Sequence, residues 1–90
     1  MEQPMMVARN GVITSIRKIG KYKSIQIDGI GVNGVVLNVD ENTVIRNQAG
    51  EVIGLDDLAV GMVIHVQHSL AMTMSLPPQT YAYSITVQSS

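Results

Sequence analysis

The sequence predicts an all-β fold in a single domain. Its 90 residues include twelve Val and ten Ile against five Leu and five Ala, and branching at Cβ favours strands over helices. Apolar and polar residues alternate with a period of two in several segments, which is the pattern of strands with one buried face. The chain is long enough for one core and too short for two.

The first two strands are predicted at residues 7–17 and 22–28, joined by a turn at 19–21. Gly11 lies where a bend or bulge would let a small barrel curl. One face of the first strand is then expected to hold Val12, Thr14 and Ile16. Alternation in the second strand places on one side Lys23, Ile25 and Ile27. The two segments together predict a hairpin.

A third strand is predicted at 35–39, where it ends in the polar turn 40–42. The segment before this strand contains three glycines, which make it less regular: Gly29, Gly31 and Gly34. The short β-type runs 43–46 and 51–53 follow, and the connection 47–50 ends in a glycine that can adopt a positive φ. This part is predicted to be a short hairpin outside the main strands.

One helical turn is predicted at 55–61. Asp56 can cap it, Leu55 and Leu58 can point inward, and Gly61 can end it in a left-handed conformation.

The last two strands are predicted at 62–68 and 80–87. Alternation puts on one face of the first Met62, Ile64, Val66 and His68. In the strand 80–87, alternation places four residues on one face: Tyr81, Tyr83, Ile85 and Val87. Between them, Pro77 and Pro78 break the chain into a loop, because proline donates no ladder hydrogen bond.

Five main strands with one short helical turn predict a small OB-like five-stranded antiparallel barrel, since closing a sheet on itself hides its edges. Another small antiparallel barrel or sandwich with a different strand order is the alternative. The domain is expected to cover residues 1–90, with 1–5 disordered and 88–90 as a tail.

Three motifs carry a resemblance to a known family. They are the Thr-x-Ile strand at 43–45, the Asp-Leu-x-x-Gly turn at 57–61, and the closing Ser-x-Pro-x-Gln-x-x-Ala-x-x-Ile-x-Val segment at 75–87. Over residues 11–87 the chain resembles the small uncharacterised β-barrel proteins of Firmicutes that are related to YobA-like domains. The resemblance implies a barrel and no known activity, and some YobA-like relatives are exported lipoproteins.

Composition and charge limit the function classes. The absence of Cys excludes disulfide frameworks, thiol catalysis and thiolate metal sites. Residues 1–27 carry a net charge of +4 and residues 28–57 carry −5, whereas residues 58–90 contain no Asp, Glu, Lys or Arg. The N-terminus lacks the pattern of a secretory signal, and the apolar run 58–64 is too short to span a bilayer. A cytoplasmic location is therefore expected.

The candidate site is the uncharged loop 69–79, because long loops on rigid barrels often carry recognition. The residues expected to bind a partner are Ser69, Leu70, Met72, Met74, Leu76, Pro77, Pro78 and Gln79. In the alternative interpretation the loop is a lid that buries Leu70, Met72 and Leu76. The partner is expected to be another protein or a second copy, which would give a homo-oligomer.

A soft-metal site is a second hypothesis. Two thioethers and an imidazole suit Cu(I), and the chain offers His68, Met72 and Met74. The Met72-Thr73-Met74 segment is similar to the Met-Thr-Met motif of periplasmic copper-carrier barrels of OB type. Met more often fills a core than binds a metal, so no cofactor is expected.

Single-stranded nucleic acid is a third hypothesis, because OB-like barrels stack bases on aromatic rings in a basic groove. Stacking and phosphate contacts would come from Tyr22, Tyr81, Tyr83, Lys18, Lys21 and Lys23. The absence of Phe and Trp and an isoelectric point near 6.0 make nucleic acid an unfavoured partner.

Catalysis is not expected. Asp56 and Asp57 are adjacent, so their carboxylates diverge and cannot form a general acid and base pair. His65 and His68 are expected on opposite faces of one strand. The sequence therefore predicts a non-catalytic binding or assembly module with no catalytic residue.

Overall fold

The computed structural model describes residues 6–28 and 34–89, so the expectation of disorder at 1–5 lies outside the described residues. Along the described residues the elements are β1 (Met6–Ile19), β2 (Tyr22–Asp28), β3 (Val35–Val39), β4 (Val44–Arg46), β5 (Val52–Ile53), the 3-10 turn η1 (Leu55–Asp57), β6 (Val63–Ser69) and β7 (Gln79–Ser89). No helix in this part of the chain has the length and apolar character needed to cross a membrane. The all-β prediction is confirmed.

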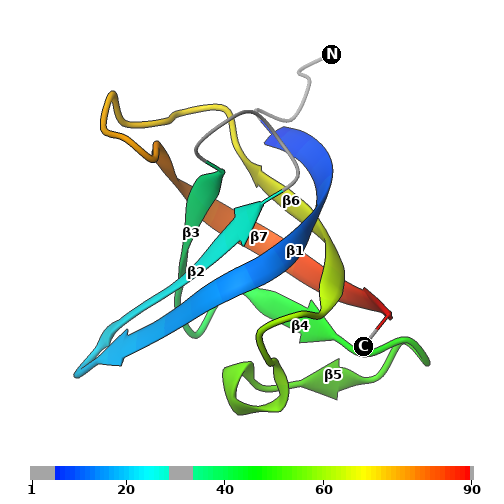
Figure 1. The fold of residues 1–90 in the computed structure, drawn as a ribbon. Coiled ribbons are helices and arrows are strands. Elements are labelled where there is room, and N and C mark those ends of the chain that lie inside the picture. Colours follow the sequence, from blue (N-terminus) through cyan, green and yellow to red (C-terminus); the bar gives the residue numbers. More distant parts are fainter. Residues whose placement is uncertain (1–5, 29–33, 90) are drawn as a thin grey trace.

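Five of the strands close into a barrel (Figure 1). The long strand β1 pairs with β6 through its first half and with β2 through its second half. β2 continues to β3, β3 pairs with β7, and β7 returns to β6. This closed order is that of an OB-like barrel, so the predicted five-stranded barrel with one short helical turn is confirmed.

One seam of this barrel differs from the antiparallel pairing that the sequence predicted. β3 and β7 run parallel, with Leu37 opposite Thr80. After the turn at 40–43 the chain continues into β4, which also runs parallel to β7, with Ile45 opposite Ile85. β7 therefore binds β3 along its first half and β4 along its second half. β7 also extends past the predicted end at Val87, because Ser89 pairs with Val63.

The core fills the barrel with the inward side chains that alternation predicted for β2, β3 and β6. The buried apolar residues are Ile13, Ile25, Ile27, Val35, Leu37, Val39, Ile45, Leu58, Ile64, Val66, Ala82, Ile85 and Val87. His68 is also buried on the inner side of β6, as predicted. Neighbouring strands thus share one apolar interior, which stabilises the barrel.

The predicted face of the first strand was wrong. Val12 and Thr14 are exposed, whereas Ile13 is fully buried. A register shift in the β1–β2 pairing between Ile13 and Ser15 puts the residues before and after it out of step, so Ile13 and Ile16 both pack in or against the core while Val12 does not. The bulge therefore lies after Gly11 rather than at it. Gly11 instead allows close strand approach, since a Cβ there would lie 2.8 Å from the carbonyl oxygen of Asp28.

The predicted face of the last strand was also wrong. A register shift between β6 and β7 leaves Tyr83 without a partner residue on β6, because Gln67 pairs with Ser84 and His68 pairs with Ala82. Ala82 is therefore buried and Tyr83 is exposed. The extra residue turns the two tyrosines out of the core.

The hairpin of β4 and β5 and the turn η1 connect β3 to β6, as predicted. Gly50 and Gly61 both have positive φ, at 86° and 96°. The capping carboxylate is Asp57 and not Asp56: the backbone N–H of Gly54 donates to Asp57 Oδ2 at 3.0 Å. The side chain of Asp56 forms an ion pair with Lys18 instead.

Candidate functional site

The loop between β6 and β7 is anchored firmly where it leaves the barrel. The buried hydroxyl of Thr80 lies 2.9 Å from the carbonyl oxygen of Ser69 and 2.7 Å from that of Ala71. The backbone N–H of Ala71 donates to the Ser69 hydroxyl at 3.0 Å. At the other end, the N–H of Val36 in β3 donates to the carbonyl of Pro78 at 2.9 Å. Both ends of the loop are thus fixed to the barrel.

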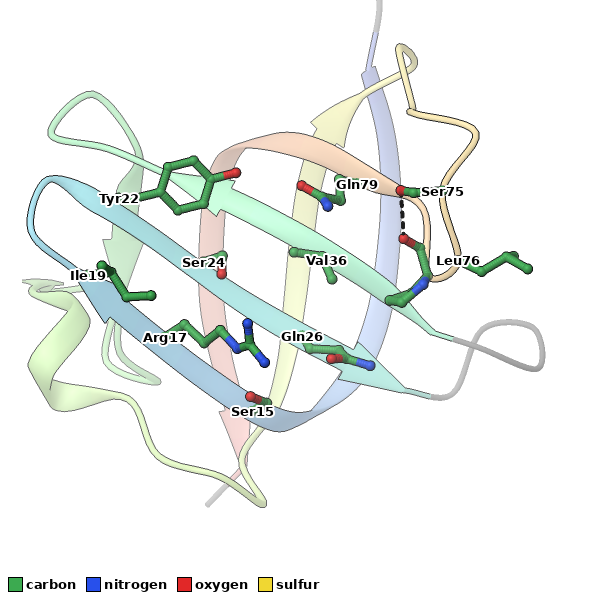
Figure 2. A pocket seen from close by; sticks show the side chains of 11 residues that line it. Ser15, Arg17, Ile19, Tyr22, Ser24, Gln26, Val36, Ser75, Leu76 and Gln79 are labelled. Carbon is green, nitrogen blue, oxygen red and sulfur yellow. Dashed lines mark hydrogen bonds between the residues drawn. The ribbon is translucent and has the colours of Figure 1, made fainter.

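The middle of the loop is braced from within. The N–H of Thr73 donates to the carbonyl of Gln79 at 2.9 Å, and the N–H of Gln79 donates to Thr73 Oγ1 at 3.0 Å. The Thr73 and Ser75 hydroxyl oxygens lie 2.5 Å apart, and Ser75 Oγ donates to the carbonyl of Pro77 at 2.9 Å. Figure 2 shows the Ser75 contact beside Leu76. These bonds hold residues 73–79 in one conformation.

The braced loop presents its large apolar side chains to solvent. Met74 is fully exposed and Leu76 is 81% exposed, while Leu70 is 51% exposed. Met72 alone of the three residues expected under a lid packs against the core, because Leu70 and Leu76 point outward. The exposed residues cost hydrophobic free energy unless a partner covers them.

A shallow groove of about 280 Å³ adjoins the loop (Figure 2). The outer faces of β1, β2 and β3 form its floor, and Ser75, Leu76, Pro77 and Gln79 form one wall. The floor and the remaining wall are formed by Ser15, Arg17, Ile19, Tyr22, Ser24, Gln26 and Val36. Of these residues, only Tyr22 was a candidate site residue from the sequence, as a stacking ring for nucleic acid. The available signal was the row of polar residues that alternates with the core of the first hairpin.

The structure does not bring the three residues of the soft-metal hypothesis together. His68 is fully buried inside the barrel, Met72 is half-buried against the core, and Met74 is fully exposed. Across residues 6–28 and 34–89, no group of three or more His, Asp or Glu side chains is placed to hold a metal ion.

The His68 ring is held in one tautomer by its surroundings. Nδ1 lies 2.8 Å from the carbonyl oxygen of Ser69, which can only accept, so Nδ1 carries the proton. Nε2 is buried and has no hydrogen-bond partner among the described residues. Burial lowers the pKa of His68, and the positive charge of Arg9 lowers it further, although the bond to Ser69 opposes both effects.

This lowered pKa predicts acid destabilisation. Below pH 6.5 the unfolded chain binds a proton at His68 that the folded chain does not, so the free energy of unfolding falls as pH falls until the lower folded pKa is reached. The slope from one such group cannot exceed about 1.4 kcal/mol per pH unit. Urea denaturation between pH 7.5 and 5.5 should show a shallower slope for His68→Leu than for the native chain. His65→Gln is the matched control, and an unchanged slope in His68→Leu would contradict the prediction.

The cationic residues of the nucleic-acid hypothesis lie beside carboxylates. Lys18 pairs with Asp56, while Lys21 and Lys23 share a second shallow pocket with Asp40 and Glu41. This arrangement reduces the positive potential that phosphates would need.

The tyrosines of the same hypothesis make hydrogen bonds or pack on one another. The Tyr22 hydroxyl donates to Asn38 Oδ1 at 3.3 Å. The Tyr81 hydroxyl donates to Asp40 Oδ1 at 2.7 Å, and this bond lowers the pKa of Asp40. The rings of Tyr81 and Tyr83 meet edge to face, with centroids 5.3 Å apart. Two of the three rings therefore already pack on each other.

The four residues considered for catalysis lie apart or have structural roles. Asp57 caps η1 and Asp56 pairs with Lys18. His65 Nδ1 lies 2.8 Å from Asn10 Oδ1 on β1, whereas His68 points into the barrel. The two imidazoles thus lie on opposite faces of β6, as the sequence predicted.

Comparison with known proteins finds a relative that matches nearly the whole chain. No family model matches the chain. A protein from Brevibacillus choshinensis named "Protease inhibitor" is 35% identical over 89 residues. The aligned region is 98% of this chain and 27% of that protein, so the chain spans about a quarter of its relative's length. The resemblance to YobA-like domains stays a prediction.

Proposed function

We propose that this chain is a non-catalytic binding module that docks a peptidase through the loop 69–79. One observation carries the proposal. Met74 and Leu76 project into solvent from a loop whose backbone is fixed by hydrogen bonds at both ends and in the middle. A loop ordered before binding loses less conformational entropy on docking, which raises affinity. Complexes between peptidases and their protein inhibitors are typical of such preformed contacts.

The choice of a peptidase as the partner comes from the relative's name. The similarity to that protein covers nearly the whole barrel, including the loop. The remainder of the relative has no counterpart in this chain, so inhibition by this region alone belongs to the proposal. Self-assembly through the same loop is the competing outcome, since an exposed apolar loop can also dock on a second copy.

The loop chemistry supports a protein partner over a charged polymer. Residues 58–90 contain no Lys or Arg, so the loop offers apolar contact and hydrogen bonds but no cation to pair with a phosphate. Arg17 is the single cation among the described residues that line the adjoining groove. A metal or organic cofactor is not part of the proposal.

The proposal is tested by direct binding. The chain is immobilised, and chymotrypsin, subtilisin, trypsin, papain and thermolysin are passed over it in a surface plasmon resonance experiment. We expect at least one peptidase to bind with a submicromolar Kd. Changing Met74 and Leu76 together to Asp should weaken that binding by at least about 100-fold, because truncating central interface anchors costs about 2 kcal/mol or more each.

The matched control carries the same change outside the loop. Val52, in β5, and Val60, before β6, are 68% and 65% exposed and lie outside the loop in sequence. Their double Asp variant should bind like the native chain. Light scattering of the native chain detects self-association. Absence of binding to all five peptidases, or equal binding by the two double variants, would overturn the proposal.

A further inference from the structure

We infer that Met74 is the residue that determines which peptidase is bound: its side chain enters the primary specificity pocket of a serine peptidase, which places the Met74–Ser75 peptide bond at the catalytic serine. This inference rests on the proposed function and identifies the partner class and the contact. The pocket it fits is an apolar slot of the chymotrypsin or subtilisin type, because the side chain is long, unbranched and uncharged.

Exposure selects Met74 from the apolar residues of the loop. Met74 is fully exposed, so every atom of its side chain is accessible to a pocket that must surround it. Leu76 contributes to the wall of the groove, and Leu70 is only half exposed beside the anchored end of the loop. A side chain that must fill a deep pocket has to stand clear of its own protein, and Met74 meets that condition best.

The hydrogen bonds within the loop hold the residues on both sides of Met74, and so they flank the Met74–Ser75 peptide bond. The residues on either side of Met74 are tied to each other, since the hydroxyl oxygens of Thr73 and Ser75 lie 2.5 Å apart, within hydrogen-bond distance. Thr73 is tied in turn to Gln79 by one backbone hydrogen bond and by a bond from the Gln79 N–H to the Thr73 hydroxyl, and the Ser75 hydroxyl donates to the carbonyl of Pro77. The flanking residues are therefore fixed while Met74 itself makes no contact that docking would have to break.

The same bonds explain why such a loop would inhibit rather than be digested. In hydrolysis the peptidase serine attacks the carbonyl carbon of Met74, the Ser75 amine leaves with a proton, and one water then releases the Met74 carboxylate. The leaving segment cannot diffuse away, because Ser75 is braced to Thr73 and the chain after it enters β7, which pairs with β6. The amine stays beside the acyl group, which favours reforming the bond over completing the cleavage.

The test changes the charge of this one side chain. Inhibition constants of the native chain are measured against chymotrypsin, subtilisin and trypsin, and the measurements are repeated with Met74→Lys. We expect the native chain to inhibit chymotrypsin or subtilisin and to inhibit trypsin weakly. Met74→Lys should weaken the inhibition of chymotrypsin or subtilisin at least about 100-fold. It should strengthen the inhibition of trypsin by a similar factor, since a trypsin-type pocket carries a carboxylate. Val60→Lys, the same change at an exposed valine outside the loop, should alter neither.

A second measurement locates the bond without relying on inhibition. Prolonged incubation of the native chain with a catalytic amount of the inhibited peptidase should add the mass of one water, and denaturation should release a fragment that begins at Ser75. Circular dichroism checks that each variant keeps the native fold.

The outcomes separate this inference from the proposed function. If the native chain binds a peptidase through the loop but Met74→Lys leaves selectivity unchanged, the inference is wrong and the proposed function stands. The same conclusion follows if a peptidase with a sulfonylated active-site serine binds as tightly as the free enzyme, or if cleavage occurs at another bond first. Failure to bind any peptidase removes both.

Discussion

Replacing Gly34 with alanine should lower the free energy of unfolding by about 2 to 5 kcal/mol, the sum of a left-handed backbone penalty and a steric one. Gly34 has a φ of 70°, a conformation that disfavours any residue with a Cβ. In addition, an alanine Cβ would lie 2.3 Å from the carbonyl oxygen of Ile27. That oxygen belongs to β2, so the clash can be relieved only by moving a barrel strand.

Gly20→Ala is the matched control for this prediction. Gly20 also has a left-handed φ, at 59°, but a Cβ there would meet nothing within 4 Å. Gly20→Ala should therefore lower the free energy of unfolding only by the backbone penalty of about 1 to 2 kcal/mol. Urea denaturation of both variants at one temperature separates the two contributions, and equal losses would show that the strand contact at Gly34 is not as close as described.

The part of the fold that sequence predicts is the part that depends on local pattern. Alternation identified the inward residues of β2, β3 and β6 because each of these strands runs without a bulge through the residues that alternate. It failed for Val12 on β1 and for Tyr83 on β7, because a register shift in each strand breaks the alternation between the residues before it and those after it. A bulge depends on the strand opposite, and the sequence of one strand does not contain that information.

The parallel seam was missed for a related reason. β3 and β7 are far apart in sequence, and nothing in either strand specifies that they should meet or run in the same direction. Only closure of the whole barrel brings them together, because the remaining strands have already used their other edges. Strand identity is thus a local property, while pairing direction is a property of the closed fold.

The candidate site shows the same division. Two prolines and a lack of charge identified the loop 69–79 from sequence. The sequence did not show whether the loop is a lid over the barrel or an exposed surface. That depends on how Thr73, Gln79 and Thr80 form hydrogen bonds across the loop. Those contacts turn Leu76 outward while Met72 packs inward. Polar residues of ordinary type thus determine which apolar side chains a partner can reach.

A comparison of Leu58→Ala with Asp57→Ala tests how the segment before β6 is held. Leu58 is 6% exposed and belongs to the core, so its truncation should cost about 2 to 5 kcal/mol. Asp57 is exposed and accepts one hydrogen bond from the N–H of Gly54, so its loss should cost about 0.5 to 2 kcal/mol. Asp57→Asn, which keeps an acceptor oxygen, should lose less than Asp57→Ala. Denaturation with urea gives the three values. If Asp57→Ala proved as damaging as Leu58→Ala, the cap rather than the buried leucine would hold this segment to the barrel.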